Sequence, residues 1–136
     1  MGVYTTIDPV TGDQIAQYSE ISDAELDALI GRSTTAYRSW RTMPLEQRRA
    51  VLLRAAEIHR EQADELAKIL TLEMGKPIAQ AKGEVALVAS IYQYYADHVE
   101  EYIADEPLDI TGPGPAVVRT EPIGPLVGVM PWNYPY

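Results

Sequence analysis

Apolar residues recur at steps of three and four through most of residues 22–104, and this spacing predicts helices with one apolar face. Ser22-Asp23-Ala24-Glu25 has the spacing of a capping box, so we expect a helix to begin there. Pro44 suits the first turn of a second helix. Gly75 and Pro77 end a third helix or an extension of the second, because glycine favours a left-handed C-cap and proline cannot continue the same helix. The first helix carries its apolar face on Leu26, Leu29, Ile30, Tyr37 and Trp40.

The strongest periodic signal predicts one helix from about Ile78 to Ala104, roughly 40 Å long at ~1.5 Å per residue. Its apolar face comprises Ala81, Val85, Val88, Ala89, Tyr92, Tyr95, Ala96, Val99, Tyr102 and Ile103. We expect these tyrosines to lie in a core rather than to form a ligand cage. Such a helix is longer than a 136-residue globule buries on its own, which suggests a larger body to pack against.

Both ends of the chain favour strands. A turn at residues 8–13, flanked by β-favouring residues within 3–18, predicts a small hairpin. After the turn at residues 112–115, Ala116 to Glu121 are typical of an exposed strand, which Pro122 limits to an edge or an end. The apolar run from Leu126 to Met130 is typical of a strand buried on both faces of a parallel sheet. Only six residues follow Met130, so no crossover to a neighbouring strand is expected after it.

Composition and charge narrow the possible partners. Apolar residues make up 46% of the chain and charged residues 23%, as in a folded globular protein. The net charge of −9 argues against a nucleic-acid partner, because phosphate binding requires a positive surface. There is no signal peptide and no apolar run of about 20 residues that would span a membrane, so we expect a cytoplasmic location.

The candidate chemistry lies at the end of the chain. Pro131-Trp132-Asn133-Tyr134-Pro135 directly follows the apolar run, and ligands bind in α/β proteins at loops that leave the carboxyl ends of strands. The Asn133 carboxamide offers an N–H donor to an incoming oxygen. On spacing alone, a turn with a helix-capping asparagine is the favoured alternative. His59 and His98 are 39 positions apart and are interpreted as structural, and no spacing of metal ligands is present.

The same residues closely resemble those of the aldehyde dehydrogenase superfamily over Arg119–Pro135, RTEPIGPLVGVMPWNYP. Three further stretches agree in order and spacing. Asp8–Asp13 is similar to the family's opening turn, and Trp40 with the helix at Arg48–Leu53 matches its second helix. Thr71–Pro77 looks like the stretch that leads into the family's long helix. The resemblance covers essentially the whole chain.

The resemblance implies an α/β fold of which this chain is the N-terminal, incomplete part. Residues 1–104 would form a hairpin and the helical part of the cofactor-binding domain. Residues 105–122 would supply two oligomerisation-arm strands, around Asp109 and at Val117–Glu121. Residues 123–136 would supply the first strand of the cofactor sheet and the Pro-Trp-Asn loop. A homo-oligomer, dimer or tetramer, would then form through the arm and the long helix.

The family oxidises an aldehyde to its carboxylic acid with NAD or NADP through a cysteine thiohemiacetal. The resemblance assigns Asn133 as the oxyanion donor and places Met130, Pro131 and Trp132 along the cofactor. No other catalytic group of the family can be transferred to this chain, which contains no cysteine. Within the family, Tyr92–Asp97 and Ala104–Leu108 look like bacterial succinate-semialdehyde dehydrogenases.

Two other functions are compatible with the sequence. The chain could be a non-catalytic interaction module that pairs with a full-length aldehyde dehydrogenase through its arm strands and long helix. It could also bind a nucleotide weakly, although one strand and one loop rarely hold a dinucleotide. In either case, the isolated chain is expected to fold poorly, since an unpaired apolar strand at Leu126–Met130 is an aggregation hazard.

Because the chain has no cysteine, we predict that the pure 136-residue polypeptide shows no aldehyde-dependent reduction of NAD or NADP. The measurement is the absorbance of the reduced nicotinamide with a panel of aldehydes. Turnover by a polypeptide free of contaminating enzyme would contradict the inference that the nucleophile lies outside this chain.

Overall fold

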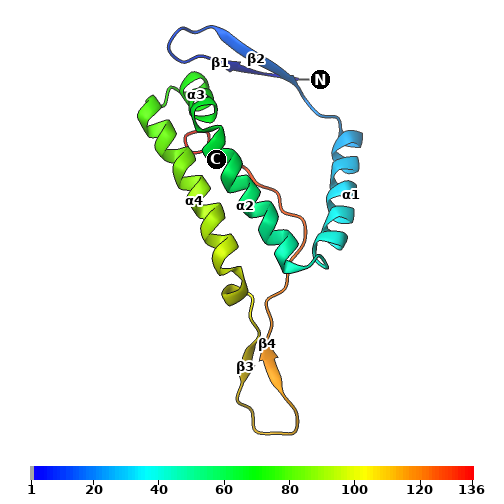
Figure 1. Cartoon of the computed structure of the whole chain (residues 1–136). Coiled ribbons are helices and arrows are strands. Elements are labelled where there is room, and N and C mark those ends of the chain that lie inside the picture. The colour runs from blue at the N-terminus through cyan, green and yellow to red at the C-terminus, as the bar shows by residue number, and fades with distance from the viewer. Residues whose placement is uncertain (1) are drawn as a thin grey trace.

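The computed structural model describes residues 2–136, and Met1, the start of the first predicted region, lies outside them. The elements in chain order are β1 (Val3–Ile7), β2 (Gln14–Ser19), α1 (Asp23–Trp40), α2 (Leu45–Glu61), α3 (Ala63–Met74), α4 (Ile78–Tyr102), β3 (Glu106–Leu108) and β4 (Ala116–Val118). The long helix α4 packs against α2 and α3, while α1 stands to one side (Figure 1). The β1–β2 hairpin lies over one end of the helices, and the β3–β4 hairpin projects from the other (Figure 1).

The helix ends follow the local signals in the sequence. At the start of α1, the Ser22 hydroxyl accepts a hydrogen bond from the Glu25 N–H at 3.3 Å, and the Glu25 carboxylate accepts one from the Ser22 N–H at 2.9 Å. The hydrogen bonds from the Ser22 side chain and backbone lower the pKa of Glu25. Pro44 is the N-cap of α2 rather than a residue of its first turn. Gln62 leaves helical geometry, with φ −105° and ψ 19°, so α3 is a separate helix and not an extension of α2.

The core lies where α3 and α4 meet and where α2 packs on α4. Five of its eight apolar residues are alanines, which lets the helices approach closely. The buried apolar residues are Ala56, Ala67, Leu70, Ala81, Val85, Val88, Ala89 and Ala96. Only Leu70, Val85 and Val88 among them are larger than alanine. Burying each such side chain contributes about 1.5–3 kcal/mol to the stability of the fold, so this core is small for a chain of this length.

The prediction that the α4 tyrosines belong to the core is wrong for two of them. Tyr92 is half-buried against the His59 ring, at 5.3 Å between ring centroids. Tyr95 and Tyr102 remain 53% and 48% exposed. The reason is that α2 covers the face of α4 that carries the alanines and does not cover the face that carries these two tyrosines. The Tyr94 and Tyr102 hydroxyls are hydrogen-bonded to each other, and this contact raises the pKa of Tyr102 to about 12.

Two apolar segments that the sequence assigns to packed elements stay exposed. No residue of α1 is buried, and its predicted apolar face meets no other helix of the described chain closely. The strand expected at Leu126–Met130 does not form, and Val127 and Val129 are 94% and 90% exposed. The physical reason is that a parallel strand needs a neighbour, and the four strands of residues 2–136 are paired in two separate hairpins.

Residues 105–122, where two arm strands are expected, contain the β3–β4 hairpin, and both of its strands are shifted from the expected positions. The first strand is Glu106–Leu108, just before Asp109, and it pairs antiparallel with Ala116–Val118. Arg119 and Asp105 form an ion pair at 2.6 Å across the base of the hairpin. This pair lowers the pKa of Asp105 and raises that of Arg119.

None of the helices formed by residues 2–136 combines the length and the apolar character needed to cross a bilayer.

We predict opposite effects of alanine at two glycines on either side of Lys76. Gly75 has φ +74°, and a Cβ there would lie 3.2 Å from Pro9 Cγ, so Gly75→Ala should lower the free energy of unfolding by about 1–2 kcal/mol. Gly83 lies within α4 with open space at its Cβ position, so Gly83→Ala should raise it by about 0.5–1 kcal/mol. Urea denaturation measures both, and equal effects of the two substitutions would contradict the left-handed cap.

Candidate functional site

The segment that contains the predicted site runs back from β4 between α1 and α2 and ends beside α3 and α4 (Figure 1). Its last part turns at residues 131–134, where the Tyr134 N–H donates to the Pro131 carbonyl at 3.2 Å. Pro131 begins this turn, and Pro135 directly follows it. The predicted loop is therefore formed, although no strand precedes it.

Lys76 holds this loop against the start of α4. Its ammonium forms an ion pair with the Glu84 carboxylate and donates a hydrogen bond to the Asn133 carbonyl at 2.7 Å. The Tyr134 ring lies 4.4 Å from the same nitrogen, which is within the range of a cation–π contact. The side chains of Lys76 and Glu84 are only 10% and 1% exposed, so water does not weaken this pair as it does a surface pair.

Tyr136 makes the second set of contacts between the loop and the helices. Its N–H donates to the Glu84 carboxylate at 3.4 Å, and its hydroxyl donates to the Leu66 carbonyl in α3 at 3.2 Å. Burial, followed by the charges of Glu84 and Glu73, raises the pKa of the Tyr136 phenol. Glu84 thus binds Tyr136 directly and is linked to Asn133 through Lys76.

The predicted site residues lie next to the Lys76–Glu84 pair, but none of their side chains forms a hydrogen bond with either residue. Asn133 is exposed, and its carboxamide has no hydrogen-bond partner among residues 2–136. Trp132 is 83% exposed and Met130 is 60% exposed. Pro131, also exposed, contributes its carbonyl to the turn. The structure therefore gathers these four residues in one exposed loop.

Sequence reasoning missed Lys76 and Glu84 as parts of the site. Glu84 lies three positions after Ala81 and four before Val88, on the apolar face of α4. A carboxylate at a core position of an amphipathic helix is the signal that could have identified it, because a buried charge requires a partner. Lys76 stands between the left-handed Gly75 and the capping Pro77, and nothing in the local pattern marks its side chain as buried.

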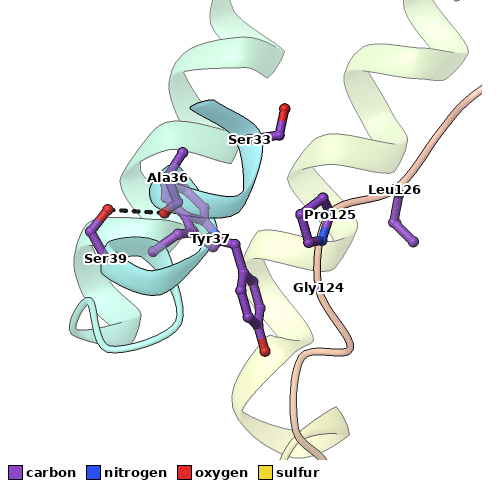
Figure 2. Close-up of a pocket in the computed structure, with 8 residues that line it drawn as sticks. Ser33, Ala36, Tyr37, Ser39, Gly124, Pro125 and Leu126 are labelled. Carbon is purple, nitrogen blue, oxygen red and sulfur yellow. Dashed lines mark hydrogen bonds between the residues drawn. The ribbon is translucent and has the colours of Figure 1, made fainter. Parts of the chain in front are cut away.

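Two hollows adjoin the same segment. A groove of about 460 Å³ lies between α1 and residues 124–126, and Figure 2 shows Tyr37 and Pro125 on its two sides. The Tyr37 hydroxyl donates to the Pro122 carbonyl at 2.8 Å and so ties the segment to α1. A second hollow of about 540 Å³ is bordered by β1, α3 and the loop, including Trp132 and Tyr136. Both are open surface features on either side of residues 124–136.

The two histidines lie on helices and bond to their own backbones. His59 Nδ1 is 2.8 Å from the Ala55 carbonyl, and His98 Nδ1 is 2.8 Å from the Tyr94 carbonyl. Within residues 2–136, no group of three histidine or acidic side chains is arranged to hold a metal ion.

Comparisons with known proteins agree with this geometry. The profile of the aldehyde dehydrogenase family matches residues 2–136. A succinate-semialdehyde dehydrogenase [NADP(+)] of Deinococcus radiodurans is 45% identical over 133 residues, which are 97% of this chain and 28% of the relative. A protein of the same description from Mycobacterium avium is 39% identical over 96% of this chain and 28% of its own length.

Solved structures give the same result. The succinic semialdehyde dehydrogenase of Streptococcus pyogenes, in complex with NADP+, matches with a TM-score of 0.91 and 37% identity, covering 98% of this chain and 29% of that one. The succinate-semialdehyde dehydrogenase of Burkholderia pseudomallei matches with a TM-score of 0.87 and 34% identity, over 98% of this chain and 28% of that one. The chain thus spans less than a third of these relatives and corresponds to the N-terminal portion of the family, which confirms the resemblance and the fold class.

The raised pKa of Tyr136 predicts a loss of stability at alkaline pH. Because the pKa of Tyr136 is higher in the folded protein than in the unfolded chain, the protonated phenol contributes to the free energy of unfolding. This contribution is complete below the unfolded pKa of about 10 and is lost as the pH rises through the raised folded value. The free energy of unfolding should therefore decline above about pH 10, and less steeply in Tyr136→Phe. Denaturation across this range measures the decline, with Tyr4→Phe in exposed β1 as the control. Equal slopes for Tyr136→Phe and the unsubstituted protein would contradict the burial of this phenol.

Proposed function

The chain belongs to the aldehyde dehydrogenase family, and we propose that it is part of an NADP-dependent enzyme that oxidises an aldehyde to its carboxylic acid. Succinate semialdehyde is the proposed substrate and NADP the proposed cofactor, because the relatives that are 37–45% identical carry both in their descriptions. Since the chain spans 28% of the Deinococcus radiodurans relative, the activity is proposed for the protein at its natural length.

The observation that supports a catalytic role for the loop is the exposed Asn133 carboxamide on a fixed main chain. When a nucleophile attacks an aldehyde, the carbonyl oxygen gains negative charge. A hydrogen-bond donor that is already in place stabilises this charge without reorganising during the reaction. The Asn133 carboxamide has two N–H donors and no competing partner among the described residues, so we assign it as the oxyanion donor. The nucleophile is not in this chain, which has no cysteine.

Met130, Pro131 and Trp132 are the residues we propose to lie along the cofactor. They are exposed, and residues 122–136 contain no acidic side chain that would repel the phosphates of a dinucleotide. When bound, the cofactor supplies the hydride acceptor for the reaction. The part played by these three residues would be to offer apolar surface and main-chain groups beside the Asn133 carboxamide.

The exposed apolar surfaces support a larger assembled protein. Ile123, Leu126, Val127 and Val129 are all largely exposed in one continuous segment, and α1 buries none of its side chains. Contiguous apolar surface of this kind marks an interaction site in soluble proteins. We propose that further parts of the enzyme cover it, and that the β3–β4 hairpin and α4 contribute to a homo-oligomer.

A second candidate function, pairing with a complete aldehyde dehydrogenase without catalysis, is favoured by the β3–β4 hairpin. This hairpin forms within the described residues and extends away from the helices (Figure 1). Co-purification of the 136-residue chain with such an enzyme would support it. A well-folded monomer that does not bind a complete family member would count against it.

Replacement of the oxyanion donor gives the direct test of the leading proposal. In the protein at its natural length, Asn133→Ala should lower kcat for succinate semialdehyde by about 10²–10³-fold, because one preorganised donor is lost. Gln80→Ala, which removes an exposed carboxamide from α4, is the matched control and should leave kcat unchanged. Steady-state kinetics with NADP measures both, and an unchanged kcat in Asn133→Ala would overturn the assignment.

A further inference from the structure

We infer that Lys76 and Glu84 are positioning residues, whose buried ion pair holds the main chain at Asn133 and Tyr136 and thereby keeps the Asn133 carboxamide free for the oxyanion. The catalytic consequence rests on the function proposed for Asn133. The fixing of the loop does not, because it follows from contacts among the described residues alone.

The backbone and the side chain of Asn133 make different contacts. Its carbonyl accepts a hydrogen bond from the Lys76 ammonium at 2.7 Å, while its carboxamide is left unpaired by the described residues. A charged donor makes a stronger hydrogen bond than a neutral one. The peptide group is therefore held by a strong contact, and the side chain extends from a backbone whose position is set by α4.

The Lys76–Glu84 ion pair itself has little freedom to move. Glu84 is on the buried face of α4, so the helix fixes the position of its carboxylate. That carboxylate accepts from both Lys76 and the Tyr136 N–H, and Tyr136 is also tied to α3 through the Leu66 carbonyl. A buried carboxylate that lost these donors would be left uncompensated, which penalises any displacement of the loop.

The Tyr134 ring also packs on the Lys76 ammonium, with its centroid 4.4 Å from the nitrogen. Lys76 thus contacts two consecutive loop residues, and Glu84 contacts a third. Catalytic donors lose effect when they shift by about 1 Å, so contacts that fix the loop should raise the rate even though neither residue touches the substrate.

The test of loop fixing is hydrogen exchange, followed peptide by peptide in the protein at its natural length. Lys76→Met leaves Glu84 buried without a partner and endangers folding, so the decisive variant is Lys76→Met combined with Glu84→Gln, which removes both charges. Exchange in residues 131–136 should be about tenfold faster or more in this double variant, with α4 peptides unchanged. Lys82→Met, a substitution in α4 that breaks an exposed ion pair with Asp64 of α3, is the control and should alter neither. Unchanged exchange in residues 131–136 of the double variant would overturn the inference.

A kinetic cycle tests whether the pair acts through Asn133. The double variant should lower kcat by about 10–10²-fold with KM for the aldehyde little changed, a loss no larger than that of Asn133→Ala. When the double variant is combined with Asn133→Ala, kcat should fall little further, because the carboxamide that Lys76 and Glu84 position is already absent. If the double variant lowered kcat by the same factor with Asn133 present and with alanine in its place, the positioning role would be overturned and a general loss of structure indicated. An unchanged kcat in Asn133→Ala would instead overturn the function proposed for Asn133, while the exchange experiment would still decide whether the pair fixes the loop.

Discussion

The Glu84 carboxylate lies out of water where α3, α4 and the last residues of the chain meet, and this buried charge constrains its whole neighbourhood. Removing one partner of such a pair costs about 3–5 kcal/mol, so Glu84 requires Lys76 beside it. Lys76 can reach it because Gly75 ends α3 in a left-handed conformation and Pro77 starts α4 at once. The ammonium then has a donor to spare for the Asn133 carbonyl.

Within residues 2–136, burial is confined to the surfaces where α4 meets α2 and α3. Ala67, Leu70, Ala81 and Val85 form the packed cluster next to Glu84, and the Tyr136 ring packs on it. By contrast, no residue of α1 is buried, and the apolar residues of 123–130 expose most of their surface. We interpret the exposed apolar surface as that of one part of a larger protein. This interpretation agrees with the comparisons, in which the chain spans less than a third of its relatives.

The features that could be predicted from the sequence are those set by local chemistry. The Ser22–Glu25 capping box and the left-handed Gly75 depend on a few adjacent residues, and both are found as predicted. Residue types and family resemblance together indicate the Pro-Trp-Asn loop, and the structure shows that its asparagine is exposed.

The features that could not be predicted depend on residues far apart in sequence. The periodicity of α4 shows an apolar face but not which part of it α2 covers, so the pattern wrongly predicts a core position for Tyr95 and Tyr102. The apolar run at Leu126–Met130 has strand character but needs a partner strand that residues 2–136 do not supply. The contact of Lys76 with Asn133 joins residues 57 positions apart, and no local pattern indicates it.

The most direct measurement is NMR of the lysine side-chain ammonium groups. The chain has three lysines, and Lys68 and Lys82 are exposed references for the buried Lys76. The account predicts that the Lys76 ammonium protons exchange slowly with water and show a hydrogen-bond coupling to the Asn133 carbonyl carbon. Proton exchange as fast as at Lys68, with no such coupling, would contradict it, because the loop would then not be held by the buried pair.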